Sequence, residues 1–206
     1  MRSRHFHEPL PTIHGMNKIT FFLLGLAAAA AVPLVLSASS SSSVAYPAAY
    51  EQALDRFPGA LVDDATVERF IAHISTPGPI THAEAASYYA PRLHFSDTLL
   101  TTNERQAVVD HLSGMREQGT QWSVRVLHTL RDAADVYLIW SMQVEFRPLL
   151  AQSRSHSIGI THLRFNAAGQ VVLQQDFWDS AEGFYEHMPV LGAVIRSINA
   201  RFASDA

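Results

Sequence analysis

The chain has 206 residues, of which 48% are hydrophobic and 17% charged, and its formal net charge is -4. This composition is that of an ordinary globular domain, and it excludes a disordered or fibrous chain. The chain has no cysteine, and beyond residue 45 it has 12 arginines, 18 acidic residues and no lysine. These counts exclude thiol catalysis and Schiff-base chemistry and argue against a nucleic-acid-binding surface.

The first 45 residues have the layout of a secretory signal. Arg2, Arg4 and Lys18 precede an uncharged apolar run at 19–36, and a serine-rich stretch follows. Ser43 and Ala45 are small residues at the two positions that a signal peptidase reads, which favours cleavage before Tyr46. Cleavage earlier, after Ala38, is the alternative.

An uncleaved N-terminal membrane anchor is the alternative to a cleaved signal. Its 18 residues are at the lower limit for spanning a bilayer, and Pro33 interrupts the second half. Met16 is a second candidate start, because it directly precedes the basic residue and the apolar run. We expect an exported protein, periplasmic or secreted. It would contact a membrane only through 19–36, if that segment stays uncleaved.

Residues 46–63 are expected to form a linker, and helices follow it. Asp64 can cap a helix with apolar residues at i, i+3, i+4 and i+7, which the Thr-Pro-Gly-Pro stretch at 76–79 ends. Capping-box patterns at 81–84 and 101–104 predict two further helix starts. A short strand is predicted between these two helices.

From Gln121 the hydrophobic period changes to two, which predicts antiparallel strands. Turns are expected at 131–135, 149–153 and 166–169, and the last strand at 171–178. Helices followed by strands indicate a single α+β domain, expected at 64–188. An amphipathic helix and tail follow at 189–206.

The common catalytic motifs are absent. The sequence has no Gly-rich phosphate loop, no Gly-x-Ser-x-Gly elbow and no His-Glu-x-x-His. A small constellation remains: Asp97 after the first strand, Thr161 on a middle strand, and Asp176 and Trp178 on the last strand. Alternation places the last two residues on one face of that strand.

These residues carry a resemblance to a known superfamily. The stretches Tyr89-Ala90, Phe95-Ser96-Asp97, 161–165 and Asp176-Phe177-Trp178 resemble SnoaL-like proteins of the nuclear transport factor two-like superfamily in their order and spacing. The resemblance covers about residues 65 to 180. It implies a cone-shaped, cystatin-like domain, in which a curved antiparallel sheet packs on N-terminal helices around an apolar cavity. It also implies a homodimer that forms through the convex face of the sheet.

Ketosteroid isomerase is the nearest mechanistic template in that superfamily. By resemblance, Asp97 stands at the position of its proton-shuttling aspartate and Tyr89 at that of a supporting tyrosine. Phe70 and Thr161 stand where the family has its oxyanion-hole tyrosine and aspartic acid, and His111 replaces another tyrosine. Losing one such donor lowers the rate about a hundred- to a thousandfold, so genuine ketosteroid isomerase activity is not expected.

The two carboxylates each have a functional and a structural interpretation. A desolvated Asp97 facing an apolar cavity could act as a general base, or it could cap a turn or the third helix. Asp176 could share a water or proton with Asp97, or it could pair with an arginine and fix the sheet. The residues expected to line the cavity are Tyr89, Phe70, Trp140, Met142, Thr161, Trp178 and His111.

No metal or cofactor is expected. His156 and His162 lie six residues apart on one strand face, but no third ligand at defined spacing accompanies them. Alternation with Thr161 places both histidines on the convex side of the sheet, where hydrogen-bonded histidines are ordinary.

The sequence therefore predicts a cofactor-independent isomerase, lyase or hydrolase of a small apolar molecule, with Asp97 as general base. The alternatives are a non-catalytic module that binds or carries such a molecule, and a dimerisation module with a filled interior. The substrate is not determined by the sequence.

Overall fold

The computed structural model describes residues 46–75, 80–147 and 152–203. The expected signal and most of the 149–153 turn lie outside these ranges, as does the stretch at 76–79. A division of the chain into compact units places Pro47–Ala206 in one unit. Within the described ranges, no helix is both long enough and apolar enough to cross a bilayer.

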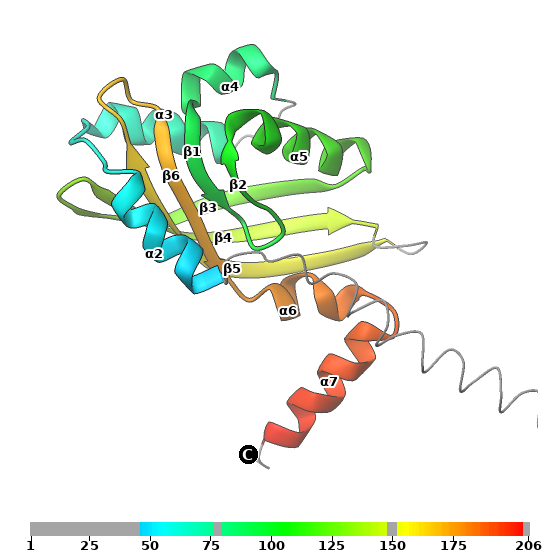
Figure 1. The fold of residues 1–206 in the computed structure, drawn as a ribbon. Helices are drawn as coiled ribbons and strands as arrows, with labels where there is room; N and C mark the ends of the chain where they lie inside the picture. The colour runs from blue at the N-terminus through cyan, green and yellow to red at the C-terminus, as the bar shows by residue number, and fades with distance from the viewer. Residues whose placement is uncertain (1–45, 76–79, 148–151, 204–206) are drawn as a thin grey trace, which may run out of the picture. The chain divides into compact units, whose positions relative to one another are not determined.

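A six-stranded sheet forms the centre of the domain (Figure 1). Its spatial order is β2-β1-β6-β5-β4-β3, and every neighbouring pair is antiparallel except β1 and β6, which run parallel. The α+β class is therefore confirmed, whereas the expected all-antiparallel sheet is wrong at this one pairing. Alternating hydrophobicity shows which face a side chain occupies, and it carries no information on strand direction. The strands are β1 (Tyr89–Ser96), β2 (Thr101–Glu104), β3 (Gln121–Asp132), β4 (Asp135–Phe146), β5 (Ser153–Phe165) and β6 (Val171–Trp178).

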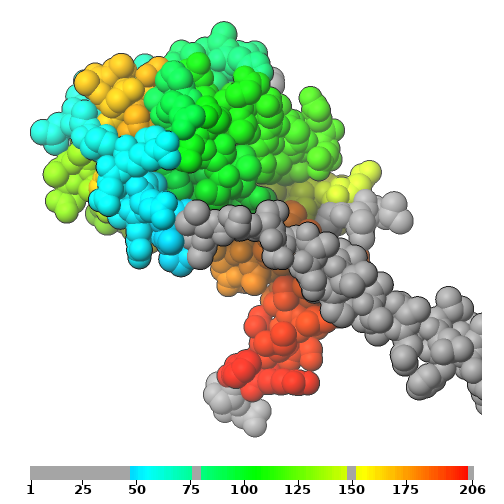
Figure 2. Space-filling model, in the orientation of Figure 1, coloured from blue at the N-terminus to red at the C-terminus, as the bar shows by residue number. Residues whose placement is uncertain are grey.

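Helices cover both faces of this sheet. They are α2 (Tyr46–Arg56), α3 (Asp64–Ser75), α4 (His82–Tyr88), α5 (Arg105–Glu117), α6 (Ser180–Gly183), the 3-10 turn η1 (Tyr185–His187) and α7 (Leu191–Phe202). In Figure 2, the green atoms of α4, β1, β2 and α5 form a continuous surface over the face in view. The segment 46–63, predicted from the sequence to be a linker, thus begins with helix α2.

The main core lies between the inner face of the sheet and helices α3 and α5. Phe70 of α3 and Val108 of α5 pack there against Leu138 and Leu163, which point inward from β4 and β5. Each fully buried side chain of this kind stabilises the fold by roughly 1.5–3 kcal/mol. This packing fixes α5 across the sheet and so positions the helix residues of the site.

Helix α2 lies on the outer face of the sheet. Ala53 and Phe57 pack there on Leu173 of β6. Beside them, the Tyr50 hydroxyl donates to Nδ1 of His162 at 2.8 Å, and Nε2 of His162 donates to Asp135 at 2.7 Å. Burial lowers the pKa of His162, although the hydrogen bond to Asp135 acts in the opposite direction. The histidine is therefore a hydrogen-bonded structural residue on the outer face.

Two of the short-range predictions have different outcomes. The capping box at Thr81 and Glu84 is confirmed, with both reciprocal hydrogen bonds present. The one predicted at 101–104 is wrong, because these residues form strand β2 and pair with β1. Helix α5 then begins at Arg105, and Glu104 before it makes no side-chain capping bond.

The end of the chain agrees with the predicted elements. Asp179 caps α6 by accepting from two backbone N–H groups, and Gly169 takes a positive φ of 72° in the 166–169 hairpin. The amphipathic C-terminal helix is present as α7, which contacts η1. Its apolar residues Val194 and Ile198 are exposed, so the stripe is not covered by the described part of the domain.

Candidate functional site

The turn between β1 and β2 holds Asp97 in a fixed conformation. Thr98 adopts a positive φ of 73°, and the backbone N–H of Asp97 donates to the carbonyl of Leu100 at 3.2 Å. Oδ1 of Asp97 accepts from the backbone N–H groups of Leu99 at 3.0 Å and Leu100 at 2.8 Å. Oδ1 of Asp97 therefore caps this turn, one of the two roles predicted for the residue, and both of its lone pairs are used.

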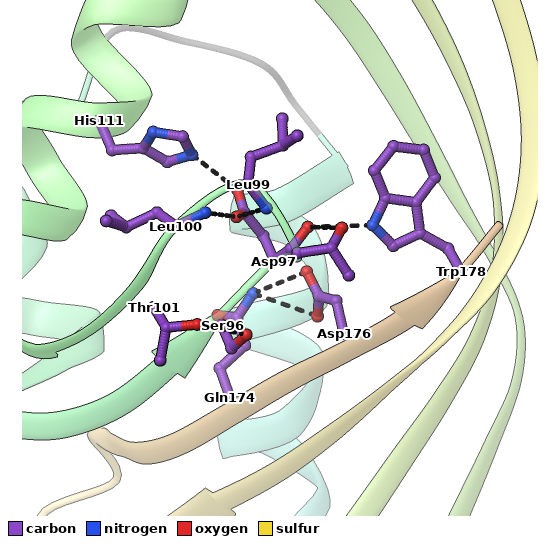
Figure 3. Close-up of polar contacts among 10 residues, drawn as sticks. Ser96, Asp97, Leu99, Leu100, Thr101, His111, Gln174, Asp176 and Trp178 are labelled. Atoms are coloured by element: carbon purple, nitrogen blue, oxygen red, sulfur yellow. Dashed lines mark hydrogen bonds and ion pairs between the residues drawn. The ribbon is translucent and has the colours of Figure 1, made fainter. Parts of the chain in front are cut away.

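The second oxygen of Asp97 faces α5. Nε2 of His111 donates to Oδ2 at 2.7 Å, and both side chains are largely buried. Figure 3 shows Asp97 between His111 and Trp178, with Asp176 beside it. Aspartate and histidine thus form a dyad in which three hydrogen bonds orient the carboxylate.

Asp176 lies on β6 opposite Thr161 of β5. The Thr161 hydroxyl donates to Oδ1 of Asp176 at 2.7 Å, and the indole N–H of Trp140 donates to the Thr161 oxygen at 2.8 Å. The side-chain N–H of Gln174 approaches the same carboxyl group at 3.4 Å. Two consecutive hydrogen bonds, from Trp140 on β4 to Thr161 on β5 and from Thr161 to Asp176, therefore set the orientation of Asp176.

The environment of Asp176 favours its neutral form. Its side chain is accessible from the hollow described below, yet protein atoms surround it, and this desolvation raises its pKa to about 7. The hydrogen bond from Thr161 acts in the opposite direction, and the nearby charge of Asp97 raises the pKa further. Among the described residues, no arginine forms an ion pair with Asp176. The prediction that Asp176 pairs with an arginine and fixes the sheet is therefore wrong for the described residues.

Trp178 connects the strand that carries Asp176 with the turn that carries Asp97. Its indole N–H donates to the backbone carbonyl of Asp97 at 3.0 Å, so β6 is joined directly to the β1–β2 turn. Alternation along β6 places Asp176 and Trp178 on the inner face, while Phe177 between them is on the outer face. One strand therefore supplies the second carboxylate and anchors the first.

Both carboxylates line a hollow of about 620 Å³ between α5, β4 and β6. Such a volume is within the range of small-molecule sites. Among the residues expected to line the cavity, Phe70 does not. It is buried behind the wall, with its ring edge-on to those of Tyr89 and Phe165. The expected residues that do line the hollow are Tyr89, Trp140, Met142, Thr161, Trp178 and His111.

Tyr89 adds a hydrogen-bond donor to the wall. Burial, together with the charges of Asp176 and Asp97, raises the pKa of its hydroxyl. The hydroxyl therefore stays protonated at neutral pH and can donate to an oxygen atom of a ligand.

Several residues of this wall were not predicted from the sequence, among them Gln174, Arg116 and Trp122. Gln174 could have been found by alternation, because it lies two residues before Asp176 on the same face. Arg116 and Trp122 also line the hollow. Alternation with Val124 gives the inward face of Trp122, whereas nothing in the local sequence distinguishes Arg116. Within the described ranges, no three potential ligands cluster in a way that could hold a metal ion.

No family model matches the sequence, and no curated protein matches it. Solved structures do match. An LEH-like epoxide hydrolase of M. tuberculosis is 14% identical, with a TM-score of 0.45 over 67% of this chain and 92% of its own. A SnoaL-like polyketide cyclase, so described, of Shewanella denitrificans is 14% identical, with a TM-score of 0.48 over 58% and 94% of the two chains. A Catenulispora acidiphila protein with a ketosteroid isomerase-like fold is 12% identical, with a TM-score of 0.48 over 59% and 91%.

The chain is similar in fold to SnoaL-like proteins. At these identities the similarity concerns the fold alone, because one fold hosts many activities. Any activity has to be argued from the two carboxylates and the hollow.

The carboxylates occupy different environments although both face the hollow. Asp97 accepts three hydrogen bonds, whereas desolvation keeps Asp176 close to half-protonated at neutral pH. Pairs of titratable groups whose surroundings differ in this way are characteristic of acid–base sites. The arrangement can bind a small molecule and move a proton to or from it.

Proposed function

We propose that the hollow is the active site of a cofactor-independent isomerase, lyase or hydrolase that acts on a small, largely apolar molecule with a reactive oxygen. One observation carries the proposal: Asp97 and Asp176 both line the hollow, and the pKa of Asp176 is about 7. A group that titrates near the working pH is present in both its acid and its base form, which favours proton transfer in both directions.

The contacts favour Asp176 over Asp97 as the group that moves the proton. Oδ1 of Asp97 is saturated by two backbone donors, and its Oδ2 is shared with His111. We therefore propose that Asp97 and His111 act as a unit that supports the reacting centre. The prediction from sequence that Asp97 is itself the general base is kept as the competing assignment.

The proposed chemistry follows from these groups. In an isomerisation, ionised Asp176 removes a proton from carbon next to a carbonyl group and returns it at another carbon. Tyr89 donates to the oxygen on which negative charge develops, and it lines the same hollow. In a hydrolysis, Asp176 takes a proton from a water whose oxygen bonds to an epoxide carbon as the ring carbon–oxygen bond breaks, and Tyr89 gives its proton to the opened oxygen. Transfer of the proton from Asp176 to Tyr89 then restores both groups.

Turnover tests this assignment. The purified protein is assayed with a panel of β,γ-unsaturated ketones and epoxides, beside Asp176→Asn and Asp97→Asn variants. Asp132→Asn, at the exposed end of β3, is the matched control. We expect Asp176→Asn to lose about a hundredfold or more of the rate, as typical for a positioned acid–base group, and the control to lose nothing.

The outcomes separate the alternatives. Full activity of Asp176→Asn would remove Asp176 from the mechanism, and loss only in Asp97→Asn would restore Asp97 as the base. A co-purified apolar ligand without turnover of any probe would favour the binding or carrier module.

We also propose a homodimer through the outer face of the sheet. The supporting observation is a group of apolar side chains there, with Ile158 66%, Ile160 40% and Phe177 38% exposed. Exposed apolar groups of this kind mark contact surfaces. Sedimentation velocity should show a dimer for the wild type and a monomer for Ile158→Arg, and a monomeric wild type would contradict the proposal.

Export remains a proposal on the sequence pattern of residues 1–45. Fractionation of cells that express the full chain, with N-terminal sequencing of the product, tests it. A mature protein that begins at Tyr46 is the expected result. An uncleaved chain in the membrane fraction would support the anchor, and an uncleaved chain in the cytoplasm would contradict export.

A further inference from the structure

An arginine lines the hollow away from the two carboxylates. The Arg116 guanidinium, in the last turn of α5, lies 4.3 Å from the ring centre of Trp122 on β3, and both residues line the hollow. Its Nη2 atom is buried and has no hydrogen-bond partner. Among the described residues, no carboxylate forms an ion pair with it. Arg116 is partly exposed as a whole, and a guanidinium with an unused N–H donor has a capacity for an anion.

The separation of this arginine from the acid–base centre follows from the sheet register. Trp122 pairs with Val144 of β4, and Trp140, whose indole donates to Thr161, lies four residues earlier on β4. Four residues of strand span roughly 13 Å. On α5, the five residues from His111 to Arg116 span roughly 7.5 Å. The backbone of Arg116 is therefore on the order of 10 Å along the hollow from the backbone positions that carry the acid–base centre.

The wall between the two ends is apolar. Met142 and Val144 of β4 and Leu112 and Met115 of α5 line this part of the hollow. A ligand that reaches both ends must therefore have an apolar middle section. The two carboxylates disfavour a negative charge at one end, and the guanidinium favours it at the other.

We infer that the hollow takes an amphipathic carboxylate, with its carboxylate group on Arg116, its apolar body along the wall and its reactive oxygen near Asp176. The planar guanidinium suits this role because it can bind a carboxylate through two parallel N–H groups while it stacks on Trp122. Arg147, which follows the end of β4 and also lines the hollow, adds a second cation. The placement of the reactive oxygen rests on the proposed function, whereas the anion site rests on the position of Arg116 over Trp122.

Binding of octanoate and of its uncharged methyl ester tests the anion site. Both are titrated calorimetrically into the wild type, Arg116→Gln and Arg116→Lys. The matched control is Arg125→Gln, an exposed arginine on the outer face of the same strand as Trp122. Charge-assisted hydrogen bonds of this kind correspond to roughly a ten- to a hundredfold change in affinity.

We expect the wild type to bind octanoate at least tenfold more tightly than the ester. Arg116→Gln should lose this preference and keep its affinity for the ester, and Arg125→Gln should behave as the wild type. Arg116→Lys should retain part of the preference, which covers the case in which Arg116→Gln does not fold. Equal binding of acid and ester by the wild type, or an unchanged preference in Arg116→Gln and Arg116→Lys, would overturn the inference.

The failure of this inference and that of the proposed function are distinguishable. The octanoate titration and the turnover assay use different probes and different variants, so either one can fail without the other. If the carboxylate preference depends on Arg116 but no probe is turned over, the anion site stands and the catalytic proposal fails. If turnover depends on Asp176 but acid and ester bind equally, the reverse holds.

Discussion

Replacing Asp176 by Asn should make the protein more stable above neutral pH. The folded state raises the pKa of this carboxyl group from 3.8 to about 7, chiefly by desolvation. Between these two values the folded protein holds a proton that the unfolded chain has released. Stability is therefore lost as the pH rises, and the loss is complete above the folded pKa.

The magnitude follows from the size of this shift. Each pKa unit corresponds to about 1.4 kcal/mol, so above pH 7 the ionised carboxylate costs the fold up to about 4 kcal/mol. Asn has nearly the same shape, cannot ionise, and keeps an oxygen that accepts from Thr161. The variant should therefore be more stable than the wild type by up to about 4 kcal/mol near pH 8, and the gain should vanish near pH 4.

Urea unfolding of both proteins across this pH range measures the difference. Because all other titrating groups are common to the two proteins, their contributions cancel. The expected result is a stability difference that grows with pH and levels off above about pH 7. A difference that is independent of pH, or a wild type that is the more stable protein near pH 8, would show that Asp176 has no raised pKa in the folded protein.

Two further substitutions test the packing and the hydrogen bonding behind the site. Gly159→Ala should destabilise the fold by roughly 1–3 kcal/mol, because the added Cβ would lie 2.3 Å from the Trp140 ring and 2.9 Å from the Phe177 carbonyl oxygen. Gly114→Ala on α5 is its control, since nothing lies within 4 Å of that Cβ, and it should be neutral or stabilising. Thr161→Val should cost roughly 1–3 kcal/mol in urea unfolding, because the indole N–H of Trp140 loses its acceptor. A Thr161→Val protein as stable as the wild type would show that this hydrogen bond is not maintained in solution.

Periodicity was sufficient to predict most elements of the fold. The α3 stripe, the strands from Gln121 onward, the 166–169 hairpin and the last strand all follow from local patterns that tertiary contacts reinforce. The error at 101–104 has a local cause, because Thr-x-x-Glu suits both a capping box and a short polar edge strand. Pairing with β1 decides between them, and that pairing is not visible in the sequence.

Helix α2 and the parallel pairing were missed for a related reason. The helix is held by contacts with residues more than a hundred positions away, such as Tyr50 with His162, and not by an apolar stripe of its own that stands out in the sequence. Long-range contacts of this kind override local propensity. The same holds for strand direction, which depends on how the chain returns to the sheet.

Part of the candidate site could be predicted from the sequence, but the hydrogen bonds between its residues could not. Alternation placed Asp176 and Trp178 on one face, and the resemblance pointed to Asp97, Thr161 and His111. The hydrogen bond from His111 to Asp97 joins a helix to a turn, and no spacing rule gives it. Arg116 is an ordinary helix residue in the sequence, and only its position over Trp122 distinguishes it.

The central claim is that Asp176 is an acid that titrates near neutrality beside a second carboxylate. A pH titration of the aspartate side-chain carboxyl carbons by NMR, with Asp176→Asn to assign the resonance, measures this directly. We expect an apparent pKa of about 7 for Asp176. The pKa of Asp176 should be lower in Asp97→Asn, because that variant lacks the nearby negative charge. A resonance that titrates near pH 4, like that of an ordinary solvent-exposed aspartate, would show that burial does not shift the pKa of Asp176.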